Sequence, residues 1–394
     1  MELIEGVVRH YDWGDDTFIP QMLGKTPDGT PYAELWFGAH PSAPSQLVDS
    51  GVSLQQAVQA DPTGVLGAAG GEQTGFPFLA KVLAATQNLS IQVHPDPDQA
   101  RKGFAAENDA GVPLDAPDRT YRDPFDKPEL ICAVTPFSAK CGLRPVERTL
   151  ALLDQLSVPS LDPIMRRLSA GSPPADRLRS VIKHLFEMEP DQVADMVEAT
   201  VTAAATADPD GPFARELAWT ERLATAHHGD VGIIVALLLN HVELQPGQAL
   251  FLGAGNMHSY LEGVGIEVMA PSDNVVRGGL TSKHIDTSEL LALLDTTPIA
   301  PAVQTPAGPI HAYDVKGEVF GLTRLDLDQA DPGLLAESTL RGPGVLICTQ
   351  GTAMIAGADQ TLQVDHGQTA FVRASDGGVS VTGTGTVHWA NSGG

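Results

Sequence analysis

Two side chains in residues 89–95 could bind a metal ion together. The segment alternates like a β-strand, so Gln92 and His94 are expected on the same face, two residues apart. They would bring an amide oxygen and an imidazole nitrogen to one point. Pro95 would end the strand directly after them, at a position where functional sites are common. The alternative is an ordinary strand whose polar side chains face solvent.

Two further residues could complete such a site. Glu129 opens an apolar strand after Lys127 and Pro128, where an inward-facing carboxylate needs a partner; a solvated turn is the alternative. His258 follows the glycine-rich residues 253–256, and glycines let the backbone turn tightly and place a side chain against a cavity. Two nitrogen and two oxygen atoms form a ligand set that Zn²⁺ accepts.

Several charged residues could contact an anionic substrate near the same place. Arg277 is followed by two glycines, so its guanidinium could extend into a pocket and bind phosphate through several donors. Asp273 on the same loop could pair with Arg277 in a structural clamp, or it could accept a proton. Lys81 interrupts an apolar strand, where burial without a purpose would be costly, and Lys127 lies close to Glu129 in the sequence.

The chain of 394 residues is long enough for two or three domains. Its formal charge of −25, from 24 basic and 49 acidic residues, would repel nucleic acid and anionic lipid, so neither is expected as a partner. The three cysteines form no CxxC pair, which favours reduced thiols in the cytoplasm. No signal peptide is visible, and the longest apolar stretch, residues 231–239, is too short to span a bilayer.

The spacing of apolar residues changes near residue 145. Residues 1–145 contain short apolar or alternating runs broken by Pro, Gly and Asp, which predicts β-strands. Brief helices are expected over 53–60 and 97–107. From residue 146 apolar residues recur at helical spacing, so residues 146–228 are expected to form a helical insertion.

Strand patterns return in residues 229–308. We expect a buried strand over 232–239, two strands around a Pro-Gly turn over 242–252, and a helix over 287–295. The last segment, 309–394, contains a strand–turn–strand unit similar to that of residues 242–252. It lacks the Gly-Asn-Met-His sequence that follows the first unit. The predicted fold is therefore mainly β, with two cupin-type, jelly-roll-like barrels, one catalytic and one C-terminal, and an α-helical domain inserted.

Taken together, these segments resemble the type I mannose-6-phosphate isomerases, the zinc-dependent phosphomannose isomerases of the cupin superfamily. The resemblance extends to about Asp286 and matches the tail only in type. It rests on Tyr11-Asp12-Trp13-Gly14, residues 33–41, residues 89–95, Lys127-Pro128-Glu129-Leu130, residues 255–258 and residues 272–281. No single stretch would suffice, but the combination is highly specific.

The resemblance implies one Zn²⁺ per chain, held by Gln92, His94, Glu129 and His258. The catalytic residues that it implies are Arg277, Lys127 and Asp273. We expect Lys81, Arg277, Ser90 and Trp13 to contact the substrate. Relatives often have His before Lys-Pro-Glu, where this chain has Asp126, so the assignment of acid and base stays open.

The activity implied is the interconversion of D-mannose 6-phosphate and D-fructose 6-phosphate through a cis-enediol, which feeds mannose metabolism and GDP-mannose synthesis. The partner would be a small sugar phosphate, and the protein would be a monomer or weak homo-oligomer. One alternative is a non-catalytic cupin that binds sugar phosphates. The other is an iron dioxygenase, whose usual His-rich ligand set differs from the set proposed for this chain.

Overall fold

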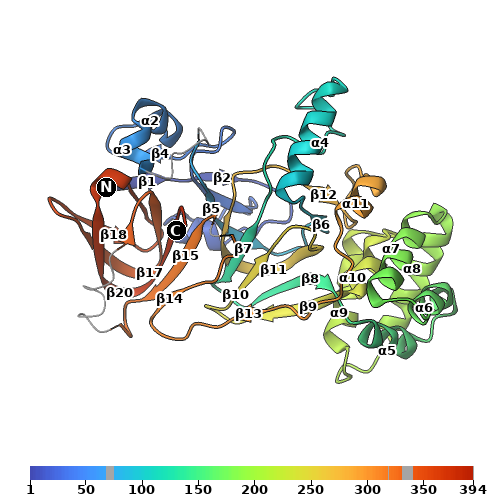
Figure 1. The fold of residues 1–394 in the computed structure, drawn as a ribbon. Coiled ribbons are helices and arrows are strands. Elements are labelled where there is room, and N and C mark those ends of the chain that lie inside the picture. The colour runs from blue at the N-terminus through green and yellow to red at the C-terminus, as the bar shows by residue number, and fades with distance from the viewer. Residues whose placement is uncertain (68–74, 318, 331–339, 394) are drawn as a thin grey trace.

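The computed structural model describes residues 1–67, 75–317, 319–330 and 340–393. Two antiparallel sheets lie next to each other, and a cluster of helices covers one end of the molecule (Figure 1). The predicted fold class, mainly β with a helical insertion, is confirmed. Within the described residues, the two terminal strands of each sheet are not hydrogen-bonded to each other. Neither sheet therefore closes into a barrel.

The central sheet has eleven strands and carries the candidate metal ligands. Its strands are β2 (Val7–Arg9), β3 (Glu34–Phe37), β5 (Leu79–Ala85), β6 (Gln92–Val93), β7 (Glu129–Ala133), β8 (Phe137–Leu143), β9 (Leu239–Leu244), β10 (Ala249–Leu252), β11 (His258–Met269), β12 (Val276–Arg277) and β13 (Val303–Gln304). The long strand β11 pairs with β5, β6, β7 and β8, so it brings together segments that are far apart in the sequence. The two strands predicted over 242–252 are β9 and β10.

The second sheet has nine strands and is built mainly from the tail. Its strands are β1 (Glu2–Glu5), β4 (Gln46–Leu47), β14 (Ile310–Ala312), β15 (Gly321–Asp326), β16 (Leu340–Arg341), β17 (Gly344–Ala356), β18 (Thr361–Asp365), β19 (Thr369–Val372) and β20 (Gly378–Asn391). β1 pairs with β19 and with β4, so two N-terminal strands belong to this sheet. The proposed boundaries assign residues 1–145 to the first barrel, and the chain thus crosses between the two sheets within that segment.

The helices predicted from residue 146 onward are confirmed. They are α5 (Val146–Leu156), η2 (Pro159–Leu161), α6 (Asp162–Leu168), α7 (Pro174–Phe186), α8 (Pro190–Ala204) and α9 (Ala214–Ala226). Elsewhere lie α1 (Phe18–Met22), α2 (Leu54–Ala60), α3 (Pro62–Leu66), α4 (Pro97–Asp109), α11 (Thr287–Leu293) and η3 (Ala374–Asp376), of which α2, α4 and α11 match predicted helices. None of the helices in the described ranges is both long and apolar enough to cross a membrane.

The strand predicted over 232–239 is wrong, because the structure has a helix there. Helix α10 (Gly232–Leu238) occupies most of this run, and a strand begins only at Leu239. All seven helical residues are buried. An apolar run without polar interruptions fits a helix buried on all sides as well as a buried strand, so periodicity could not separate the two.

The helical cluster anchors the strands that carry the candidate site. Its apolar core includes Ile91, Val93, Met257 and Val276 together with residues of α5 to α11. Each of these four residues is the direct neighbour of a predicted site residue in the sequence. Because strand neighbours point to opposite faces, burying Ile91 and Val93 in the helical core directs the flanking polar side chains toward the other face of β6.

A lysine lies buried where α9 approaches the central sheet. Lys140 on β8 is 1% exposed, and the charged groups near it are Arg144, Glu216 and His241. Burial, assisted by the charge of Arg144, lowers the pKa of Lys140 to about 7. An unfolded lysine has a pKa near 10.4, so the unfolded chain binds more protons at this residue between about pH 7 and 10.

We therefore expect Lys140→Met to stabilise the protein most at or below pH 7. The gain should shrink as the pH rises toward 10, because the folded chain must release the Lys140 proton that the unfolded chain keeps, and this release costs less as the pH approaches the pKa of the unfolded lysine. Thermal unfolding of parent and variant between pH 6 and 10 measures this difference. A gain that is the same at every pH would contradict the assignment.

Candidate metal centre and substrate cavity

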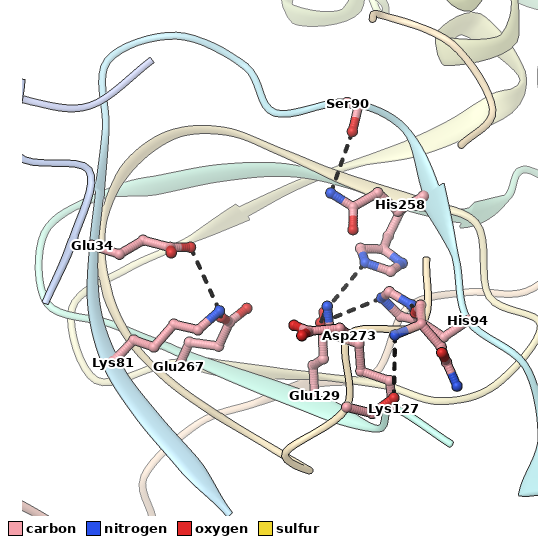
Figure 2. A network of polar contacts seen from close by, with 12 residues as sticks. Glu34, Lys81, Ser90, His94, Lys127, Glu129, His258, Glu267 and Asp273 are labelled. Atoms are coloured by element: carbon pink, nitrogen blue, oxygen red, sulfur yellow. Dashed lines mark hydrogen bonds and ion pairs between the residues drawn. The ribbon is translucent and has the colours of Figure 1, made fainter. Parts of the chain in front are cut away.

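Three predicted ligands converge on one point at the edge of the central sheet. The Nε2 atoms of His94 and His258 each lie 3.3 Å from an oxygen of the Glu129 carboxylate. The possible ligand atoms of the three residues all lie within 4.8 Å of one another, and all three residues are buried (Figure 2). Three groups far apart in the chain thus lie close enough together to hold one metal ion.

The hydrogen bonds of the two histidines determine which nitrogen faces the centre. His94 Nδ1 lies 2.9 Å from the carbonyl oxygen of Asn274, and His258 Nδ1 lies 2.9 Å from that of Asn256. A carbonyl oxygen only accepts, so each Nδ1 carries the ring proton and each Nε2 of a neutral ring presents a lone pair to Glu129. This is the usual orientation of histidine ligands around a metal.

These residues fit a divalent cation. Burial lowers the pKa of His94 to about 4, although Glu129 opposes this effect, so the ring is neutral near pH 7. Its Nε2 is buried and has no hydrogen-bond partner within the described chain. Burial alone would raise the pKa of Glu129, but His94 and Lys127 hold it well below the usual range. Two nitrogen lone pairs and a carboxylate that face one another are the ligand set of Zn²⁺.

Gln92 lies beside this group and can provide the fourth ligand. On the strand pairings, its backbone lies opposite His258 in β11 and opposite Arg277 in β12. Its side-chain Nε2 lies 3.4 Å from the hydroxyl of Ser90, which leaves Oε1 available to a cation. Its role as a ligand stays a prediction, as do the roles of the other site residues.

A cavity opens next to the metal ligands. The predicted residues that line it are Lys81, Ser90, Gln92, Lys127, Glu129 and His258. Lys127 Nζ lies 3.3 Å from Glu129 Oε1, so an amine lies at the border between the ligands and the cavity. His94 is fully buried behind Glu129, where it can serve a metal but does not line the cavity.

Sequence reasoning missed two carboxylates in the same cavity. Glu267 Oε2 lies 2.7 Å from Lys81 Nζ, and Glu34 Oε1 lies 3.5 Å from it, all three side chains being buried (Figure 2). Glu34 also accepts a hydrogen bond of 2.7 Å from the indole of Trp36. The available signal was a carboxylate within an apolar run, Glu34 before Leu35 and Glu267 between Ile266 and Val268, since such a group must have a partner. Lys81 therefore has a structural reason for its burial.

We expect Glu267→Gln to destabilise the protein by about 2–4 kcal/mol, because it removes the nearer partner of a buried ammonium group. Urea unfolding of the metal-free protein measures the loss. The double variant Lys81→Met with Glu267→Gln is the control, because it removes the buried charge as well. It should be more stable than the sum of the two single effects predicts. Strict additivity would show that the ion pair is not coupled.

The remaining predicted residues, Arg277, Asp273 and Trp13, are not among the residues that line this cavity. Arg277 lines a neighbouring depression, and no described carboxylate lies within ion-pair distance of its guanidinium. Asp273 pairs with His40 at 3.3 Å, and this contact helps to keep the pKa of Asp273 below its ordinary value. Trp13 is half-buried and packs with the apolar cluster that includes Leu89.

Asp126, which differs from the family pattern, is not among the residues that line the cavity. It is half-buried, and burial raises the pKa of its carboxyl.

The comparisons with known proteins agree with this geometry. The family model for phosphomannose isomerase type I, catalytic domain, matches residues 1–146. The chain is 35% identical to mannose-6-phosphate isomerase of Escherichia coli K12, with 98% of each chain covered. The chain belongs to the type I phosphomannose isomerase family. The related enzyme of Salmonella typhimurium is 36% identical over 98% of each chain.

Solved structures of the family cover the whole chain. A zinc-bound mannose 6-phosphate isomerase superposes with a TM-score of 0.89 at 33% identity, covering 100% of this chain and 99% of that one. A Salmonella typhimurium isomerase bound to its substrate and to zinc superposes with a TM-score of 0.88, at the same identity and coverage. Membership in the family, which the sequence stretches predicted, is thus confirmed.

Proposed function

We propose that this chain is a zinc-dependent mannose-6-phosphate isomerase that interconverts D-mannose 6-phosphate and D-fructose 6-phosphate. The observation that carries the proposal is the buried group of His94, Glu129 and His258 at the border of a cavity lined by Lys81 and Lys127. Names and ligands of the related enzymes support both the reaction and the metal.

The charged side chains divide between the two ends of an open-chain sugar phosphate. We assign the phosphate to Arg277, whose guanidinium has Arg122 nearby as a like charge. Burial and that charge lower the pKa of Arg277, and a bound phosphate would relieve the repulsion. Lys81 is the second predicted substrate contact, but Glu267 and Glu34 already balance its charge. Ser90 and Trp13 are the remaining proposed contacts.

Isomerisation requires that the C2–H bond breaks and that a C1–H bond forms, with a cis-enediol between the two steps. When bound, Zn²⁺ supplies Lewis-acid stabilisation of the negative charge that develops on the sugar oxygens, worth several kcal/mol. We assign the proton transfer at C1 and C2 to Lys127, whose Nζ lies 3.3 Å from Glu129 Oε1. We assign the movement of a hydroxyl proton during ring opening to Asp273, whose half-exposed carboxylate lies 3.3 Å from His40 Nε2. Positioning by Arg277 keeps the reacting carbons beside Lys127.

We further propose the division into segments 1–145, 146–228, 229–308 and 309–394, a cytoplasmic location and a monomeric or weakly associated state. All three cysteines are free and buried, which supports a reducing compartment. A formal charge of −25 supports the absence of nucleic-acid and membrane partners. The product would then enter mannose metabolism and GDP-mannose synthesis.

A coupled assay tests the proposed reaction. Fructose 6-phosphate formed from mannose 6-phosphate is measured in protein treated with a chelator and then reloaded with Zn²⁺. We expect turnover to disappear on chelation and to return with the metal. Full turnover after complete metal removal would refute the zinc dependence. Absence of turnover in metal-loaded protein would refute the enzyme assignment and favour a non-catalytic sugar-phosphate binder.

A further inference from the structure

Asn274 connects three segments that carry proposed site residues. It lies on the loop between β11 and β12, and it is 0% exposed. Its neighbour Asp273 and the nearby Arg277 belong to the same loop. Its carbonyl oxygen contacts His94, and its side chain contacts the segment that leads to Lys127 and Glu129. Asn274 therefore lies where the three segments meet.

The side-chain amide of Asn274 is fully engaged with the backbone of the segment that precedes Lys127. Its Nδ2 donates to the carbonyl oxygens of Asp123 and Phe125, each at 2.8 Å. Its Oδ1 accepts from the amide of Arg122 at 2.7 Å. The two carbonyl oxygens each need a donor, and the backbone amide needs an acceptor. The short planar side chain of asparagine provides two N–H donors and one oxygen acceptor.

The backbone of Asn274 performs a second task. Its carbonyl oxygen accepts the Nδ1–H of His94 at 2.9 Å, which turns the lone pair of Nε2 toward Glu129. The side chain therefore holds the Asp123–Phe125 backbone against the carbonyl that orients His94. Since Lys127 and Glu129 follow Phe125 closely in the chain, the amide sets the spacing between His94 and Glu129.

We propose that Asn274 is a positioning residue for the metal centre, acting through His94 and through the segment that carries Glu129. The inference rests on the proposed zinc site but not on the isomerase reaction. Residues that hold metal ligands in place typically contribute about 10- to 100-fold to metal affinity. Asn274 is not one of the proposed substrate contacts. Its effect should therefore appear in zinc binding before any sugar is added.

Asn274→Asp tests the proposal with little change of shape. The carboxylate would face two carbonyl oxygens without a donor, and the segment would move away from His94. We expect the dissociation constant for Zn²⁺, measured by competition with a chromophoric chelator, to rise at least about tenfold. The measurement uses the full chain without sugar, so its outcome is separate from that of the coupled isomerase assay.

Asn240→Asp is the matched control. Asn240 Nδ2 also donates to backbone carbonyls, those of Cys141, Gly142 and Ile299 at 3.0–3.1 Å, but none of these residues is a proposed ligand. Both variants should lower the melting temperature, whereas only Asn274→Asp should weaken zinc binding by more than about threefold. If Asn274→Asp does not fold, Asn274→Ser, which removes the same two amide donors, is measured instead. Zinc affinity within about threefold of the parent in the folded variant would overturn the proposal.

Discussion

Glu129→Gln should abolish isomerase activity while the protein stays folded. The substitution keeps the shape of the side chain but removes the only carboxylate of the group formed by His94, Glu129 and His258. A neutral amide oxygen is a much weaker ligand for Zn²⁺ than a carboxylate. Loss of Lewis-acid stabilisation worth several kcal/mol corresponds to a rate reduction of about a thousandfold or more.

The metal-free form of Glu129→Gln should be less stable than the metal-free parent, because buried Lys127, whose Nζ lies 3.3 Å from Glu129 Oε1, loses its ion-pair partner. A new hydrogen bond to a histidine should offset part of this loss. The histidine Nε2 atoms lie 3.3 Å from the carboxylate oxygens and present lone pairs to them. The amide group of glutamine can donate to one of those nitrogens, which satisfies a buried acceptor that has no hydrogen-bond partner among the described residues of the parent. Thermal unfolding in chelator measures this stability, and isothermal titration measures the loss of zinc binding.

Glu262→Gln is the control for the change of charge. Glu262 lies on β11, the strand that begins at the candidate ligand His258, but its side chain is 42% exposed and pairs with Arg222 at 2.6 Å. An exposed ion pair contributes about 0–1 kcal/mol, so this variant should retain activity within about twofold and bind zinc as the parent does. Parent-like activity of Glu129→Gln in zinc-loaded protein would contradict the assignment of the metal centre.

The candidate metal ligands could be proposed from local patterns because the physical constraint on each is local. Gln92 and His94 alternate with Ile91 and Val93, and the burial of those apolar residues in the helical core directs the polar pair to the opposite face. Glu129 opens an apolar strand, where only a partner explains a carboxylate. Their convergence was not visible in any one segment, and it followed from the resemblance to a family that combines all of them.

The features that were missed depend on contacts between distant segments. Glu34 and Glu267 join Lys81 only because β3, β5 and β11 are neighbours in the sheet, and that order is not encoded in any short pattern. Strands β1 and β4 join the tail sheet for the same reason. Helix α10 was predicted as a strand because its seven residues are apolar on every side, which removes the periodicity that separates the two structures.

Arg277→Ala should reduce kcat/KM for mannose 6-phosphate by about 30- to 150-fold. A charge-assisted, bidentate contact between guanidinium and phosphate contributes roughly 2–3 kcal/mol when it is partly shielded from water. Arg277 is half-buried, and no carboxylate in the described part of the chain lies within ion-pair distance to neutralise it, so its charge is available to the substrate.

The comparison with unphosphorylated mannose decides whether that contact is with phosphate. Mannose offers no phosphate to Arg277, so its kcat/KM, although low in the parent, should change by less than about threefold in Arg277→Ala. Arg101→Ala is the matched control, because Arg101 is an exposed arginine on α4 that pairs with Asp98. It should leave both substrates unaffected within about twofold, as expected for an exposed ion pair. An equal loss for mannose and mannose 6-phosphate in Arg277→Ala would move Arg277 from the phosphate to the reacting end of the sugar.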